Sequence, residues 1–141
     1  MASYHFHLTQ VKRSRGQSVI AQAAYRAGEK LYSTYYGESS DFTRKRGVVM
    51  AEICLPDHAP REYADRETLW NALEWAESGR KAQLAHSFDI TLMNEFSMEE
   101  NIEMARAFVQ EELVSRGMIA DFAIHDPVRP KGAEPNPHIH T

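Results

Sequence analysis

Three histidines near the C-terminus have the residue types and spacing of a metal site. His138 and His140 flank Ile139, and residues i and i+2 of a β-strand share a face, so both imidazoles would point the same way. His125 ends the strand predicted before them, and antiparallel pairing of the two strands would bring all three imidazoles together. Three neutral imidazoles with open coordination positions suit Zn²⁺, Mn²⁺ or a similar ion, which can bind a phosphate oxygen in phosphoryl transfer. Spacing alone leaves the pair undecided, because His5-Phe6-His7 repeats the pattern in the first predicted strand.

Tyr25 is a candidate nucleophile for such a transfer. It follows Ala21-Gln22-Ala23-Ala24, whose small residues leave room for its ring, and Arg26 and Lys30 lie close by. A phenol has a pKa of about 10, and nearby cations or a metal-bound phosphate favour the phenolate in attack. A tyrosine whose ring packs in the core is the ordinary alternative, and the chain offers five rivals: Tyr4, Tyr32, Tyr35, Tyr36 and Tyr63.

The elements that must position these residues follow from the hydrophobic pattern. Alternating apolar and polar residues predict strands over 4–11, 47–55, 86–92, 118–125 and 138–141. Helical spacing predicts helices over 18–31, 66–77 and 97–116, the last opened by a Ser97/Glu100 capping box and stopped at Gly117. The remaining stretches read as a basic turn at 12–16, a loop with short extended pieces at 32–46, and a proline-containing loop at 126–137. This order predicts an α+β fold with one main sheet.

Composition bounds the class of protein. The 141 residues, 43% hydrophobic and 10% aromatic, suffice for one modest globular domain, and no apolar run is long enough to span a bilayer. The N-terminus lacks the pattern of a secretory signal, and the single Cys54 cannot form an internal disulfide, so we expect a cytoplasmic protein. The net charge of −4 hides a polarity, because residues 1–50 carry +5 and the rest carry −9. A basic face toward nucleic acid is therefore compatible with the acidic total.

Taken together, the segments resemble the MobA/MobL family of relaxases, a branch of the HUH endonucleases. The resemblance runs through almost the whole chain in the same order. It rests on Tyr4-His5-Phe6, on Arg13-Ser14-Arg15-Gly16-Gln17-Ser18, on residues 23–31, on Asp41-Phe42-Thr43-Arg44-Lys45, on Ala123-Ile124-His125-Asp126 and on Asn136-Pro137-His138-Ile139-His140.

The resemblance implies an antiparallel, palm-like central sheet with helices packed on it. It also implies strand-specific nicking and strand transfer of single-stranded DNA at an origin of transfer, with accessory mobilisation proteins as partners. Tyr25 would attack the phosphodiester and become joined to the 5′ phosphate, while His125, His138 and His140 bind a divalent ion (Mn²⁺, Mg²⁺ or Zn²⁺). Asp89 falls where relatives carry an acidic residue close to the site, and would orient a ligating imidazole.

The basic N-terminal half is expected to contact the DNA. Cations would follow the phosphates while bases stack on aromatic side chains such as Tyr32, Tyr35, Tyr36 or Phe42. The predicted DNA-binding residues are Arg13, Arg15, Arg26, Lys30, Arg44 and Lys45.

Two departures from the family pattern and two alternatives remain. His7 stands where relatives more often have a small polar residue, and the chain ends one residue after His140, so residues 1–141 are expected to be a single relaxase domain truncated at its C-terminus.

An HUH replication initiator uses the same chemistry, although its tyrosine usually follows the His-x-His pair. A non-catalytic single-stranded DNA-binding module would use the basic residues and leave the histidines structural.

Overall fold

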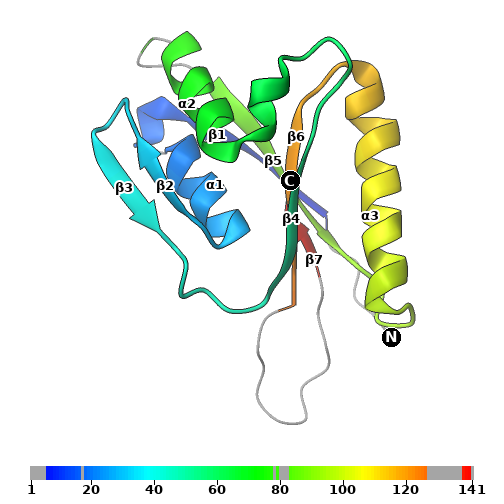
Figure 1. The fold of residues 1–141 in the computed structure, drawn as a ribbon. Helices are drawn as coiled ribbons and strands as arrows, with labels where there is room; N and C mark the ends of the chain where they lie inside the picture. The colour runs from blue at the N-terminus through cyan, green and yellow to red at the C-terminus, as the bar shows by residue number, and fades with distance from the viewer. Residues whose placement is uncertain (1–5, 17, 78, 80–82, 127–137, 141) are drawn as a thin grey trace.

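The sheet is antiparallel throughout and holds five strands in the order β1-β5-β7-β6-β4 (Figure 1). The computed structural model describes residues 6–16, 18–77, 79, 83–126 and 138–140. Its strands are β1 (Phe6–Lys12), β4 (Val48–Cys54), β5 (Gln83–Thr91), β6 (Ala120–His125) and β7 (His138–His140). A separate hairpin pairs β2 (Lys30–Ser33) with β3 (Glu38–Asp41). The predicted fold class, an antiparallel sheet with helices packed on it, is confirmed.

Helices cover both faces of the sheet (Figure 1). One face carries α1 (Val19–Ala27), α2 (Arg66–Ala76) and the hairpin, and the other carries α3 (Met98–Glu112). Short 3-10 turns lie at Arg13–Arg15, Arg61–Ala64 and Val114–Arg116. Within the described residues, no helix is both long and apolar enough to cross a membrane.

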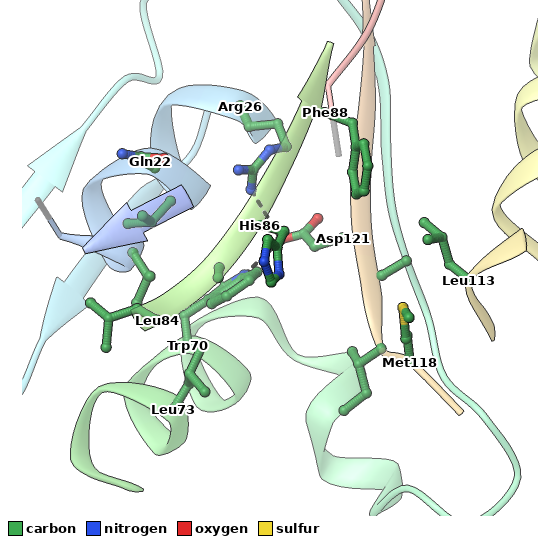
Figure 2. Close-up of a pocket in the computed structure, with 15 residues that line it drawn as sticks. Gln22, Arg26, Trp70, Leu73, Leu84, His86, Phe88, Leu113, Met118 and Asp121 are labelled. Carbon is green, nitrogen blue, oxygen red and sulfur yellow. Dashed lines mark hydrogen bonds and ion pairs between the residues drawn. The ribbon is translucent and has the colours of Figure 1, made fainter. Parts of the chain in front are cut away.

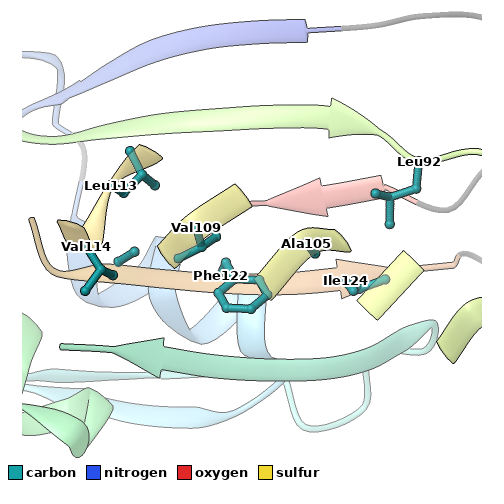
Figure 3. Close-up of a cluster of buried hydrophobic side chains, with 8 residues drawn as sticks. Leu92, Ala105, Val109, Leu113, Val114, Phe122 and Ile124 are labelled. Atoms are coloured by element: carbon teal, nitrogen blue, oxygen red, sulfur yellow. The ribbon is translucent and has the colours of Figure 1, made fainter. Parts of the chain in front are cut away.

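The larger core lies between α3 and the sheet (Figure 3). Phe122 and Ile124 of β6 are fully buried there against Ala105 and Val109 of α3. The alternate β6 residues therefore face the opposite layer, where α1 packs. This alternation explains why β6 is buried at all six positions while carrying Asp121 and His125.

The α1 region differs from the sequence prediction. The predicted helix over 18–31 ends at Ala27, because Gly28 adopts a left-handed conformation (φ 67°) and its N–H donates to the Ala24 carbonyl. A Cβ at Gly28 would lie 3.2 Å from a Val48 methyl group, so both conformation and space favour glycine. The expected loop at 32–46 contains most of the β2–β3 hairpin, whose polar, exposed residues give little periodic signal.

Candidate functional site

Tyr25 projects from α1 towards the segment after β3, where it contacts Phe42 and Lys45. Ser18 caps the helix by accepting a hydrogen bond from the Ala21 N–H, and the buried residues Ile20, Ala23 and Ala24 fix which side of α1 faces the core. Tyr25 lies off that side and is 50% exposed. The helix therefore presents the tyrosine to solvent while its neighbours anchor it.

The ring of Tyr25 lies against two aromatic side chains. Its centroid is 5.4 Å from that of Phe42, edge to face, and 6.5 Å from that of His125. The residues predicted as nucleophile and metal ligand, 100 positions apart in the sequence, are thus neighbours in space.

His125 is buried, with 3% of its surface exposed, and its ring meets the backbone of α1. Its Nε2 lies 2.6 Å from the carbonyl oxygen of Arg26. Because a carbonyl only accepts, Nε2 is the donor in this contact, and in the neutral ring Nδ1 is then the nitrogen that carries the lone pair. Histidines that bind metals usually donate their other ring N–H to a carbonyl or carboxylate in this way. The environment of His125 therefore fits a ligand that binds through Nδ1.

The register of the central strands aligns the other predicted residues. His138 is the cross-strand partner of His125, and His140 is the partner of both Ala123 and Asp89. Directly paired positions lie on the same face of a sheet, so 138 and 140 share the face of His125 and Asp89. His7 on β1 is the partner of Asp89 on its other side, which extends this row to the edge strand.

No group of three or more potential metal ligands comes together among the described side chains. The side chains of His138 and His140 lie outside that set, as does His5, so the predicted three-histidine site stays a prediction. On the same face, a cavity of about 450 Å³ opens beside the tyrosine. It is lined by Ser18, Ala21, Gln22, Tyr25, Arg26, Phe42, Ser87 and Asp89.

A buried ion cluster joins α1, α2 and β6, and Figure 2 shows three of its members, Arg26, Trp70 and Asp121. Asp121, only 4% exposed, accepts hydrogen bonds from the Arg66 guanidinium and from Trp70 Nε1 at 2.7 Å. Arg26 NH1 lies 3.9 Å from the same carboxylate. Burial lowers the pKa of Arg26, and the charge of Arg66 lowers it further, against the opposing effect of Asp121. Sequence reasoning missed this cluster, although a carboxylate in an apolar strand is itself a signal of a buried partner.

The predicted DNA-binding cations occupy different environments. Arg13 bonds to the Glu74 carboxylate and to backbone carbonyls, and stacks on Tyr35. Arg26 is buried, whereas Lys30 and Arg44 are exposed. Lys45 is partly buried against Tyr25, and the side chain of Arg15 lies outside the described set.

Comparison with known proteins identifies the family. The sequence model of the MobA/MobL family matches residues 17–141. The chain belongs to the MobA/MobL family. The predicted resemblance to these relaxases of mobilisation and conjugal transfer is thereby confirmed.

Individual relatives agree. The probable mobilization protein MobA of Bifidobacterium longum is 34% identical over 140 residues, which are 99% of this chain and 24% of that protein. The conjugal transfer protein TraA of Rhizobium radiobacter is 37% identical over 150 residues, or 99% of this chain and 13% of TraA. A chain solved in work on vancomycin-resistance transfer in Staphylococcus aureus has a TM-score of 0.88 and 35% identity, covering 99% of this chain and 68% of its own. This MobA/MobL chain thus spans no more than a quarter of the MobA and TraA relatives.

Proposed function

We propose that this domain nicks one strand of DNA at an origin of transfer, with Tyr25 as nucleophile beside a divalent cation held by His125, His138 and His140. The observation that carries the proposal is the meeting of Tyr25 with His125, whose ring centroids lie 6.5 Å apart at a cavity that Asp89 also lines. The names of the relatives, which include mobilization and conjugal transfer proteins, support the substrate class.

The donor set fits a divalent ion. The ring of His125 bonds to the Arg26 carbonyl, as metal-binding imidazoles commonly bond to a backbone carbonyl, and positions 138 and 140 share its face. When bound, the ion would offset charge on the non-bridging phosphate oxygens. Asp89, the cross-strand partner of His140, would orient that imidazole.

The reaction is an exchange of phosphate esters and needs no oxidant. The Oη of Tyr25 forms a bond to phosphorus as the bond from phosphorus to the 3′ oxygen breaks. The phenol proton passes to solvent, and the leaving 3′ oxygen takes up a proton. Because one ester replaces another, the reverse reaction rejoins the strand, as strand transfer requires.

The DNA would approach over the exposed side of Tyr25. Lys30 in β2 and Arg44 after β3 are exposed and are proposed to contact phosphates. Removing both charges (Lys30→Ala with Arg44→Ala) should weaken binding and flatten its salt dependence by a slope of about one to two. An unchanged slope would make them ordinary surface charges.

The test uses the full-length protein and single-stranded oligonucleotides tiled across the non-coding DNA beside its gene. With Mn²⁺ or Mg²⁺, the wild type should form a protein–DNA adduct that survives denaturation, and EDTA should abolish it. Tyr25→Phe should bind DNA and form no adduct. Tyr63→Phe, which removes a hydroxyl outside the cavity, is the matched control and should form as much adduct as the wild type.

Other outcomes decide between the alternatives. An undiminished adduct in Tyr25→Phe would move the role to another tyrosine. Cleavage without any adduct would make water the nucleophile and contradict the proposal. Binding with neither cleavage nor adduct would favour a non-catalytic DNA-binding module.

A further inference from the structure

Residues 41–45, here called the 41–45 turn, form a compact segment beside α1. Asp41 Oδ1 accepts hydrogen bonds from both the N–H and the hydroxyl of Thr43, at 2.9 and 2.7 Å. The Lys45 N–H donates to the Phe42 carbonyl, and the Phe42 N–H donates to the carbonyl of Glu29, just after α1. The 41–45 turn is therefore held together by its own hydrogen bonds and is joined to the C-terminal end of α1, the helix that carries Tyr25.

Two side chains of the 41–45 turn enclose the ring of Tyr25. Phe42 meets it edge to face. Lys45 Nζ lies 3.3 Å from the ring centroid, over its face, and donates a 3.0 Å hydrogen bond to the Tyr25 carbonyl. The ammonium thus contacts both the ring and the backbone of the same residue.

Lys45 is not an ordinary surface lysine. Its side chain is partly buried, and burial, together with the charge of Arg26, lowers the pKa of Lys45 to about 8. A lysine that reached for DNA phosphates would keep its ammonium in water. The contacts instead direct this ammonium to Tyr25.

We infer that Lys45 is a positioning residue for Tyr25: its ammonium holds the ring at the cavity and offsets the negative charge that enters the ring as phenolate. This inference rests on the proposed function. A neutral phenol attracts a cation only through its quadrupole, whereas a phenolate spreads a full negative charge into the ring. The attraction therefore grows when the Tyr25 hydroxyl loses its proton for attack, and again when the oxygen leaves phosphorus during rejoining. Interactions that strengthen along the reaction accelerate it.

The first arm of the test needs no reaction. 3-Fluorotyrosine at position 25 of the full-length, DNA-free protein reports the ring's environment by ¹⁹F NMR. Lys45→Met should move the resonance towards the value of the free amino acid, and Lys45→Arg should leave it close to the wild type. Arg116→Met removes one charge from an exposed side chain elsewhere and is the matched control. An identical spectrum for Lys45→Met would overturn the positioning contact.

The second arm measures the rate of adduct formation in single turnovers at saturating DNA. Lys45→Met should slow the rate about tenfold, in line with a cation–π contact that strengthens as charge develops. DNA affinity should change by less than about twofold. Lys45→Arg should restore most of the rate, and Arg116→Met should match the wild type. A loss confined to affinity would make Lys45 a phosphate contact and overturn the inference.

A pH series separates the effect of the Lys45 charge from the effect of the shape of its side chain. The titratable and charged groups on the surrounding elements are Tyr25 and Arg26 of α1, His125 of β6, whose ring centroid lies 6.5 Å from that of Tyr25, and Asp41, Arg44 and Arg46 on the segment of Lys45 itself. Dividing the wild-type rate by the Lys45→Met rate cancels their shared titrations. Lysine is cationic below its pKa, so this ratio should be largest near about pH 7 and approach one near about pH 9.5. The Lys45→Arg ratio should stay level, because arginine remains charged.

The experiments distinguish a failure of the Lys45 inference from a failure of the proposed nicking function. An adduct that depends on Tyr25, with a Lys45→Met rate equal to the wild type, would overturn this inference and leave the proposed function intact. A wild type without any Tyr25-dependent adduct would overturn the proposed function and the chemical half of this inference, and the ¹⁹F spectrum would then decide the contact.

Discussion

The proton on His125 is the residue-scale detail that most constrains the site. Since Nε2 faces the Arg26 carbonyl, the proposed ligand atom is Nδ1, and Arg26, the residue after Tyr25, fixes the orientation of the ring. The proposed metal ligand His125 and the proposed nucleophile Tyr25 are therefore both held by the backbone of α1.

We expect His125→Ala to weaken Mn²⁺ binding at least about 100-fold, measured by calorimetry on the full-length protein. Protons compete with the ion for imidazole nitrogens, so wild-type affinity should be highest above about pH 6.5 and fall below it. His58→Ala, which changes an exposed histidine outside the site, is the control. Equal affinity for Mn²⁺ in wild type and His125→Ala would remove His125 from the proposed ligand set.

Residue types and spacing could predict the candidates but not their surroundings. The choice of Tyr25 and His125 as candidates follows from motif patterns, and the contact between their rings agrees with that choice. The roles of Lys45 and Asp121 come from contacts between distant segments, which a single sequence does not specify. Lys45 was predicted to contact phosphate because it belongs to the basic run 44–46, and the lysines of such a run usually hold their ammonium groups in water.

At the scale of elements, Asp121 joins the tyrosine helix to the sheet. Its side chain is 1% exposed, and those of Arg26 and Arg66 are each 10% exposed. We expect Asp121→Ala to lower the free energy of unfolding by about 3–5 kcal/mol, because it removes the carboxylate beside the buried Arg26 guanidinium and leaves Arg66 with its Glu29 ion pair alone. Urea unfolding measures the change. Asp57→Ala, at an exposed position, should cost less than about 0.5 kcal/mol, and a similarly small loss for Asp121→Ala would contradict this account.

Elements with strong local signals were predicted well. The Ser97/Glu100 capping box opens α3 as expected, and Gly117 follows the last turn with φ 89°. Strand β5 begins three residues earlier than predicted, at Gln83, where pairing with β1 extends it beyond the alternating stretch. The hairpin was harder to predict because its strands are short and largely polar.

At the scale of the whole molecule, the described residues leave a gap in the sheet between β5 and β6. Within the described part of the chain, β7 pairs with residues 89–91 and 123–125, and a cavity of about 280 Å³ opens beyond it between the two longer strands (Figure 2). Leu84, His86 and Phe88 line one side, and Ala120 and Asp121 line the other. Among the described residues, Arg26 NH1 at this cavity is buried without a hydrogen-bond partner. We propose that residues after His140 extend β7 through this cavity, so that the relaxase domain continues past residue 141.

Hydrogen exchange tests this proposal. In the full-length protein, the amides of residues 83–88 and 120–122 that point towards the cavity should exchange more slowly than in a chain of residues 1–141. Their neighbours that point towards β1 or β4 already have partners and provide the internal control. Equal exchange in the two chains would mean that no further strand enters there.

The order of the strands also bears on biosynthesis. β7 is central in space but last of the described strands in sequence, so β1 with β5 and β4 with β6 form two separate ribbons until residues 138–140 emerge from the ribosome. Asp89 belongs to one ribbon and His125 to the other. A nascent chain that has made only the tyrosine helix and these ribbons lacks the strand that joins them. Under the proposed mechanism, a nascent chain cannot cut DNA before residues 138–140 have emerged from the ribosome.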